Sequence, residues 1–357
     1  MNVQFLPTDE QVMMRESVRR WTAQEHRTSD DPGQHWALFA ELGWLMAALP
    51  ESAGGLGGNA YDAAIIAEEL GRGLVRAPFV DVAVVAAQAA LALAPKRTPA
   101  IAEGAERPLL AHGEAEARGD QNWVACRADQ SGGRWLLTGT KTGIVGAALA
   151  TSFLVSARLP EGRVGLFEVA AAEAPLRACT TIDDRSGGEL RLDATPARLV
   201  DRDAQAALSL ATDHGLVVES AEALGAMQAA FDLTRDYLLT RRQYGQLIGE
   251  FQALRHRLAD MFIELEQARS MVLRGLAGLV ENGPDRAALA AATRARVAQA
   301  GIFIGSQAIQ LHGGIGVTEE YPVGAYYKRL VAFDLRYGTG AVQVERFATL
   351  APVLQTG

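Results

Sequence analysis

The spacing of hydrophobic residues divides this chain into three stretches of different character. In residues 8–110, apolar side chains recur at three- and four-residue intervals, as at Val12, Met13, Val18 and Trp21. That period places them along one face of a helix. The first stretch is therefore predicted to be a block of amphipathic helices.

The second stretch, residues 108–199, consists of hydrophobic runs of strand length. Examples are Trp135–Thr140, Phe153–Ala157 and Gly165–Val169, and turn residues such as Ser131–Gly133 separate them. Short runs bounded by glycine or acidic turns are typical of β-strands. This stretch predicts a small antiparallel β domain, either a barrel or a sandwich.

The helical period returns after Asp201 and continues almost to the end of the chain. Long helices are predicted at about 204–240, 248–282 and 285–312, joined by tight connections. Helices of this length and connection pack most simply as an up-and-down bundle. The predicted units are a helical domain at 1–107, a β domain at 108–200 and a helical bundle at 201–357.

Composition and charge exclude several classes of protein. The 357 residues are 49% hydrophobic and 21% charged, as in an ordinary globular protein. The net charge of −8 provides no overall positive field for nucleic acid or an anionic membrane. The most apolar run, Val82–Ala94, is shorter than the roughly 20 residues of a membrane span. It predicts a buried helix.

The cysteines and histidines indicate neither a disulfide framework nor a metal site. Cys126 and Cys179 are the only cysteines and lie 53 residues apart. His256 and His312 have no partner at metal-ligand spacing, so no metal is predicted. The first residues lack the basic and apolar regions of a signal peptide. We expect a cytoplasmic protein with free thiols.

Several segments of the bundle carry a recognisable signature. They are Arg241–Gly245, Phe251–Ala253, Leu258–Met261 and the glycine-rich Gln310–Pro322. In this order and spacing they resemble the signature of acyl-CoA dehydrogenases, and Leu42–Gly57 extends the resemblance into the first block. The resemblance implies a mainly α protein with a small β domain, built as an N-terminal helical domain, a central β-barrel and a C-terminal four-helix bundle.

The same resemblance implies an oxidoreductase that binds FAD. The guanidinium of Arg241 can pair bidentately with a pyrophosphate, and Gly313–Gly314 lets backbone N–H groups approach phosphate. Tyr244 can lie against adenine and Gln252 can bond a ring edge. In the family these segments reach across a subunit interface, so the resemblance implies an oligomer. The expected FAD-binding residues are Arg241, Tyr244, Gly245, Phe251, Gln252, Gln310, His312, Gly313, Gly314 and Thr339.

The catalytic base of the family is missing from its usual place. The family removes a proton from the α-carbon of an acyl-CoA thioester while the β-carbon passes a hydride to the flavin. An ungapped match from Arg329 puts Gly338 where most members have a Glu, and the second known base position falls at about Gly215. Glu219 lies one helical turn after Gly215 and is the candidate for a substitute base.

The β domain also departs from the family pattern at two segments that flank the flavin ring. Ala111–Asp120 and Lys141–Gly146 lack the usual Thr and Trp side chains. These departures resemble the small subunits of bacterial heteromeric acyl-CoA dehydrogenases that act on bulky acyl groups, as in steroid degradation. The resemblance implies a hetero-oligomer with a second, base-bearing subunit, and an electron-transfer flavoprotein as electron acceptor.

Three hypotheses for function follow from these observations. The first is an FAD-containing subunit that takes part in α,β-desaturation of an acyl-CoA with a partner subunit. The second is a self-sufficient homo-oligomeric flavoenzyme that uses another base, such as Glu219. The third is a scaffold or regulatory subunit without flavin.

Overall fold

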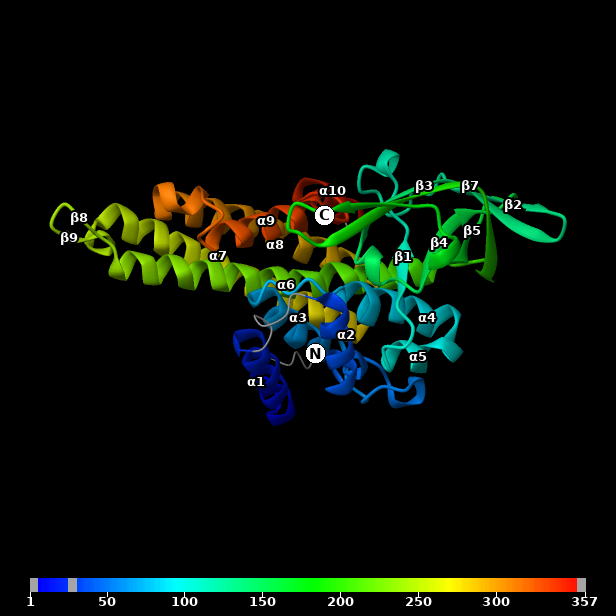
Figure 1. The fold of residues 1–357 in the computed structure, drawn as a ribbon, viewed down its shortest axis with the longest axis horizontal. Helices are drawn as coiled ribbons and strands as arrows, with labels where there is room; N and C mark the ends of the chain where they lie inside the picture. The colour runs from blue at the N-terminus through cyan, green and yellow to red at the C-terminus, as the bar shows by residue number, and fades with distance from the viewer. Residues whose placement is uncertain (1–5, 25–30, 352–357) are drawn as a thin grey trace, which may run out of the picture.

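A single helix, α6 (Gln205–Thr240), runs along the length of the molecule and contacts all three parts of the chain (Figure 1). The structure is a computed structural model that describes residues 6–24 and 31–351. Buried residues occur on every side of α6. A helix that is apolar all round belongs in the core, and here α6 separates the N-terminal helices from the bundle.

The N-terminal block packs on one side of α6. Its third helix begins with a capping box, in which the Asn59 side chain accepts from the N–H of Tyr61 at 2.9 Å and the Asp62 carboxylate accepts from the N–H of Asn59 at 2.7 Å. The predicted buried helix at Val82–Ala94 is confirmed, but its first part is a π-helix. The elements are α1 (Asp9–Gln24), α2 (Pro32–Glu41), η2 (Trp44–Met46), η3 (Glu51–Ala53), α3 (Ala60–Arg72), η4 (Val80–Ala86), α4 (Ala87–Leu93), η5 (Pro95–Arg97) and α5 (Thr98–Ala102).

Helices α3 and α6 touch through their backbones. A Cβ atom on Gly71 would lie 1.9 Å from the carbonyl oxygen of Glu222, and one on Gly225 would lie 1.8 Å from that of Glu68. Only glycine permits this approach. The N-terminal block is thereby held tightly against the bundle.

The β domain is a small closed barrel. Strands β4, β2, β3, β7 and β5 pair in that order, and β5 pairs back to β4 to close the ring. Most pairs are antiparallel as predicted, but β1 and β2 each pair with β4 in parallel. The elements are β1 (Pro108–Ala111), η6 (Ala115–Ala117), β2 (Arg127–Ser131), β3 (Arg134–Val145), η7 (Ala147–Leu149), β4 (Ser152–Arg158), β5 (Val164–Ala170), η8 (Ala171–Glu173), β6 (Leu176–Thr180) and β7 (Ser186–Asp201).

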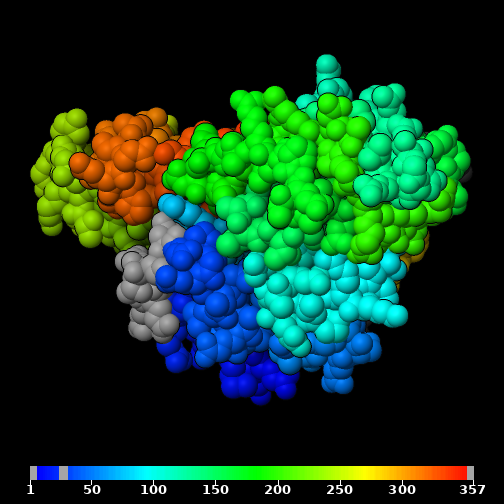
Figure 2. Space-filling model, turned by 45° about the vertical axis from the view of Figure 1, so that its right-hand side comes forward, coloured from blue at the N-terminus to red at the C-terminus, as the bar shows by residue number. Residues whose placement is uncertain are grey.

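The C-terminal helices complete the bundle with α6, and the three predicted long helices are confirmed. The end of the bundle that carries a short hairpin projects beyond the N-terminal block (Figure 2). The elements after α6 are β8 (Arg242–Gln243), β9 (Gln246–Leu247), η9 (Ile248–Glu250), α7 (Gln252–Glu281), α8 (Arg286–His312), η10 (Gly313–Val317), α9 (Val323–Leu335) and α10 (Gly340–Leu350). Within residues 6–24 and 31–351, no helix combines the length and apolar character needed to cross a membrane.

Candidate functional site

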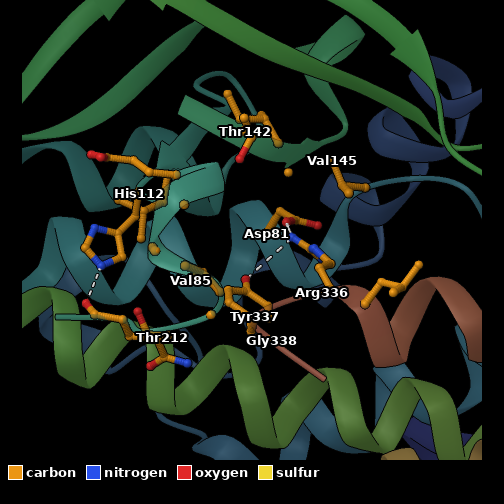
Figure 3. A pocket seen from close by; sticks show the side chains of 18 of the residues that line it. Asp81, Val85, His112, Thr142, Val145, Thr212, Arg336, Tyr337 and Gly338 are labelled. Carbon is orange, nitrogen blue, oxygen red and sulfur yellow. Dashed lines mark hydrogen bonds and ion pairs between the residues drawn. The ribbon is translucent and has the colours of Figure 1, made fainter. Parts of the chain in front are cut away.

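A pocket lies where the three parts of the chain meet. Its walls are η4, the segment after β1, the end of β3, helix α6 and the turn between α9 and α10 (Figure 3). Its empty volume, including the opening to solvent, is about 950 Å³. The walls combine apolar with polar and charged side chains. Figure 3 labels nine of the lining residues: Asp81, Val85, His112, Thr142, Val145, Thr212, Arg336, Tyr337 and Gly338.

The turn between α9 and α10 is held in a fixed shape. Tyr337 and Gly338 both have left-handed backbone angles, with φ of 58° and 86°. The Gln343 side chain donates to the carbonyl oxygen of Tyr337 at 2.6 Å. The N–H of Gly340 donates to the Asp334 carboxylate at 2.8 Å at the start of α10. The turn therefore presents Gly338 to the pocket from a rigid support.

A side chain at the usual base position, Gly338, would be crowded by its neighbours. A Cβ atom there would lie 3.0 Å from the Cα of Gly119 and 3.0 Å from Cγ1 of Val342. Both contacts are tighter than ordinary van der Waals packing. The segment after β1 thus closes directly on the turn, and a Glu at position 338 would require the backbone around Gly119 to move.

The second base position, Gly215, is also closed. A Cβ atom there would lie 2.7 Å from Cγ2 of Val85 and 3.3 Å from the hydroxyl oxygen of Tyr337. Val85 comes from η4 and Tyr337 from the turn after α9. Side chains from two other elements therefore fill the space that a base at position 215 would occupy.

Glu219 is held by two arginines away from the pocket wall. It is 2% exposed, and its two oxygens accept from Arg294 Nη1 at 2.8 Å and Arg336 Nη1 at 2.7 Å. Burial alone would raise its pKa, but Arg336 and Arg294 outweigh burial and lower the pKa to about 2. It is not among the residues that line the pocket. A carboxylate that binds protons this weakly is a poor general base near neutral pH.

The other acids on the same part of α6 are paired as well. Asp213 accepts from Arg286 at 3.0 Å and from Arg346 at 2.7 Å. Glu222 accepts from Arg329 at 2.8 Å. These carboxylates tie α6 to α8, α9 and α10 and are not directed into the pocket.

Asp81 is an acid that does line the pocket, and the sequence analysis did not select it. It lies in η4, is 7% exposed and accepts a hydrogen bond from Arg336 Nη2 on Oδ1. Figure 3 shows this pair beside Tyr337. The only sequence signal was an acid between valines in an otherwise apolar run, Val80–Val82.

A second buried polar cluster supports the segment after β1. Lys141 is fully buried, and its ammonium donates to Glu114 Oε1 at 2.6 Å, to Ser156 Oγ at 2.9 Å and to the carbonyl oxygen of His112 at 3.2 Å. The Glu114 carboxylate also accepts two backbone N–H groups at the entry to β2. Lys141 thus fixes the segment that closes on the turn.

His112 in this cluster is a neutral imidazole at physiological pH. Burial and the nearby Lys141 ammonium lower its pKa to about 4. Because Nε2 lies 2.8 Å from the carbonyl oxygen of Gln121, Nε2 carries the proton and donates. Nδ1 then accepts from the Ser156 hydroxyl at 2.8 Å. The cluster forms one continuous hydrogen-bonded chain beneath the pocket.

Most of the expected FAD-binding residues lie elsewhere, at the outer end of the bundle (Figure 1). Arg241, Tyr244 and Gly245 lie on the β8–β9 hairpin, and Tyr244 is 93% exposed. Phe251, half-buried, contacts Tyr244 edge to face, and Gln252 begins α7 at the surface. We refer to the residues 241–252 and 310–314 as the outer surface.

The glycine-rich segment joins this surface through stacked aromatic rings. The His312 ring lies 4.6 Å from that of Tyr237, in the last turn of α6 before the hairpin, and 4.8 Å from that of Tyr321. His312 is 3% exposed and donates from Nδ1 to the Ala308 carbonyl oxygen at 2.7 Å. Only its backbone is available to a ligand. Thr339, at the start of α10, is the one expected residue placed near the pocket instead.

The outer surface fits a phosphate-bearing cofactor. The Arg241 guanidinium makes no hydrogen bond or ion pair with any other described residue. A Cβ atom on Gly245, Gly313 or Gly314 would meet nothing within 4 Å, so these backbones are open. The N–H of Gly313 already donates to the carbonyl oxygen of Gln310, so the features that suit a pyrophosphate are the unpaired guanidinium and the absence of side chains over the glycine backbone. Among the described residues no group of His, Cys, Asp and Glu is arranged to hold a metal ion.

Comparison with known proteins identifies the class of protein. Residues 207–350 match the family model "Acyl-CoA dehydrogenase, C-terminal domain", and residues 8–96 match "Acyl-CoA dehydrogenase, N-terminal domain". The chain is 30% identical over 317 residues to the acyl-CoA dehydrogenase IpdE2 of Mycolicibacterium smegmatis, covering 88% of this chain and 86% of that protein.

Solved structures give the same result. A variant of the Tcur3481–Tcur3483 steroid ACAD superposes with a TM-score of 0.86 at 30% identity, covering 96% of this chain and 97% of that one. The ChsE4–ChsE5 complex from Mycobacterium tuberculosis has a TM-score of 0.83 at 24% identity, with 97% and 98% covered, and shows the shared fold. The chain belongs to the acyl-CoA dehydrogenase family. It is therefore an FAD-dependent oxidoreductase of acyl-CoA thioesters.

Proposed function

We propose that this chain is the small subunit of a heteromeric acyl-CoA dehydrogenase, in which it helps to desaturate a bulky acyl-CoA between the α- and β-carbons. In this arrangement the outer surface completes a flavin site whose catalytic Glu belongs to the partner subunit. FAD, when bound, accepts the hydride that leaves the β-carbon of the substrate. The remaining steps depend on side chains of the two subunits.

The observation that carries the proposal is the contrast between the outer surface and the two base positions. Arg241, Tyr244 and Gly313–Gly314 keep the residue types and the accessibility that FAD needs. Gly338 and Gly215 not only lack a carboxylate but are enclosed by neighbouring atoms. A chain that keeps the flavin-binding outer surface but has no catalytic carboxylate is suited to complete a flavin site in another subunit.

Each outer-surface residue has a distinct part in that site. The Arg241 guanidinium would pair with pyrophosphate oxygens, and the open backbone at Gly313 and Gly314 would let those oxygens approach closely. Tyr244 would stack on adenine, and Gln252 would bond its edge. His312 would orient the glycine-rich turn from below through its bond to Ala308.

The proposed partners follow from the same relatives. The two chain names in the Tcur3481–Tcur3483 steroid ACAD describe an enzyme made of two different chains, which supports a hetero-oligomer here. A substrate with a steroid-like acyl group, an electron-transfer flavoprotein as acceptor and a cytoplasmic location complete the proposal. Glu219, with both oxygens paired and a pKa of about 2, does not support the self-sufficient alternative.

Co-expression with a base-bearing family member tests the proposal. We expect the chain alone to retain little flavin and the complex to be yellow and to bleach on addition of an acyl-CoA. In the complex, Arg241→Ala should lower FAD affinity by roughly 10- to 100-fold, since a charge-assisted hydrogen bond contributes about 1.5–3 kcal/mol. Arg242→Ala, on the same hairpin and also exposed, is the matched control.

Three results would contradict the proposal. One is a homo-oligomer of this chain that is yellow and reduces its flavin with acyl-CoA at the full rate. Another is equal loss of FAD in Arg241→Ala and Arg242→Ala. The third is a stable complex that never contains flavin, which would favour a scaffold.

A further inference from the structure

The pocket in this chain contains a carboxylate in a setting suited to proton transfer, although both family base positions are glycine. The acids that line the pocket are Asp81, Glu114 and Asp120. We propose that Asp81 is a catalytic residue of this pocket, the general base that accepts the α-proton of an acyl thioester bound here. The inference goes beyond the proposed function, which places the desaturation at the partner's Glu, and it needs only that an acyl-CoA also enters the pocket of this chain.

The other two acids are unsuitable for different reasons. Glu114 is occupied by the Lys141 ammonium and by the backbone N–H groups of Ala125 and Cys126. Asp120 is exposed and accepts from the N–H of Asn122 in a local turn. A general base needs a free oxygen that is shielded from water, and neither residue provides both.

Asp81 provides both. It is 7% exposed, and Arg336 occupies only Oδ1. Oδ2 accepts no hydrogen bond from any described residue, and it is not one of the fully enclosed atoms without a partner. Oδ2 is therefore open to the pocket that Asp81 lines.

The position of Asp81 relative to the lost base supports the same role. Its partner, Arg336, precedes Gly338 by two residues in the rigid turn, so the carboxylate lies at the end of the pocket that a base on that turn would serve. One turn further along η4, Val85 fills the space beside Gly215. Asp81 is thus bonded to the turn that carries Gly338 and shares η4 with the side chain that contacts Gly215. π-Helical turns such as η4 are frequent at functional sites.

Electrostatics around Asp81 favour proton uptake. Burial raises its pKa, and the facing groups act in both directions: Arg336 from the turn and Arg185, just before β7, lower it, while Glu219 from α6 raises it. The net shift is upward, which makes the carboxylate a better proton acceptor than an ordinary Asp. Because Arg336 is also bonded to Glu219, it keeps an anionic partner when Asp81 becomes protonated.

The proposed step needs no oxidant. The α-carbon C–H bond breaks, its proton goes to Oδ2 of Asp81, and the electron pair moves onto the thioester carbonyl as an enolate. The proton on Oδ2 exchanges with solvent through the opening of the pocket, and return of a solvent-derived proton from Asp81 to the α-carbon restores the thioester. In D₂O the reversible step replaces α-hydrogen with deuterium, and this exchange can be measured separately from flavin reduction.

The experiment follows deuterium incorporation at the α-carbon by mass spectrometry. The probes are butyryl-CoA and the bulkier cyclohexylacetyl-CoA, incubated with the chain alone and with a complex whose partner has its catalytic Glu replaced by Gln. We expect exchange above the protein-free rate, a loss of about 10²-fold or more in Asp81→Asn, and no change in Asp120→Asn. Asp81→Glu keeps the carboxylate and should lose much less than Asp81→Asn.

A pH profile distinguishes a base from a structural residue. The exchange rate should rise with pH through a midpoint above the ordinary Asp value of 3.8, and this rise should be absent in Asp81→Asn. Exchange absent from the unsubstituted protein in both preparations, or equal in Asp81→Asn and Asp120→Asn, would overturn the proposal. Complex formation and FAD content, measured on the same samples, report separately on the proposed function.

Discussion

The pocket and the outer surface differ in whether their polar side chains are buried and paired within the chain. Around the pocket, Lys141 and Glu219 are buried, Arg336 is largely buried, and each of the three is bonded to an oppositely charged partner within the chain. At the outer surface, Arg241 and Tyr244 are exposed and contribute little to internal packing. The pocket residues are therefore expected to matter for stability, and the outer-surface residues for association. The four substitutions below test this difference, from the largest expected effect to the smallest.

Lys141→Met should have the largest effect. It leaves the Glu114 carboxylate buried without its cation, and removing one member of a buried ion pair costs about 3–5 kcal/mol. Chemical denaturation gives the free energy of unfolding. Lys328→Met, which removes a surface pair with Glu319, should leave that free energy nearly unchanged. Equal effects of the two variants would contradict the supporting role of Lys141.

Glu219→Gln should have the next largest effect and should depend on pH. The pKa of Glu219 is about 2 in the folded chain and about 4.5 when unfolded, so its contribution is complete above pH 4.5 and is lost as pH falls towards 2. At pH 7 the variant should lose on the order of 3 kcal/mol. Between pH 4.5 and 2 its stability should fall less steeply than that of the unsubstituted chain. The exposed Glu266→Gln is the control, and identical slopes for Glu219→Gln and the unsubstituted chain would refute the assignment.

Gly119→Ala should have an intermediate effect. Its Cβ would lie 2.6 Å from the Cα of Gly338, and its φ is +91°. Gly143→Ala is matched because its φ of +69° is also positive, but nothing lies within 4 Å of its Cβ. Both variants lose about 1–2 kcal/mol from the backbone angle, so the additional cost of Gly119→Ala, about 1–3 kcal/mol, measures the contact. Equal costs in chemical denaturation would show that the segment and the turn separate easily.

Tyr244→Ala should have the smallest effect on the isolated chain. At 93% exposure, its loss should change the free energy of unfolding by less than about 0.5 kcal/mol. Retention of FAD by the complex, measured by absorbance after gel filtration, should nevertheless fall. Tyr237→Ala, which removes the ring stacked on His312, should instead destabilise the chain itself. If Tyr244→Ala also destabilised the chain, the conclusion that outer-surface residues do not contribute to stability would be wrong.

Much of the fold could be predicted from local patterns. The helical period extends over enough residues in α6, α7 and α8 to predict that these helices exist. The parallel pairing of β1 with β4 depends on contacts far apart in sequence and was not predicted. The unit boundaries near residues 107 and 200 stay a prediction.

The candidate site was harder to predict because its properties depend on which charges meet. Glu219 has the correct helical spacing, but spacing could not show that Arg294 and Arg336 occupy its oxygens. Asp81 has no motif around it. What marks it as a candidate is its hydrogen bond with Arg336, which lies 255 residues away in sequence. The outer-surface residues were easier to select because the family motif is local, and their role remains a prediction.

The contacts at Gly338 and Gly215 also bear on the history of the chain. A Glu codon restored at position 338 would place its Cβ against Gly119, and one at position 215 would meet Val85. Neither single change leads back to a working base without accompanying shifts in other elements. Under the proposed dependence on a partner, these contacts oppose the return of the carboxylate, because a Glu at either position also needs its neighbours to shift.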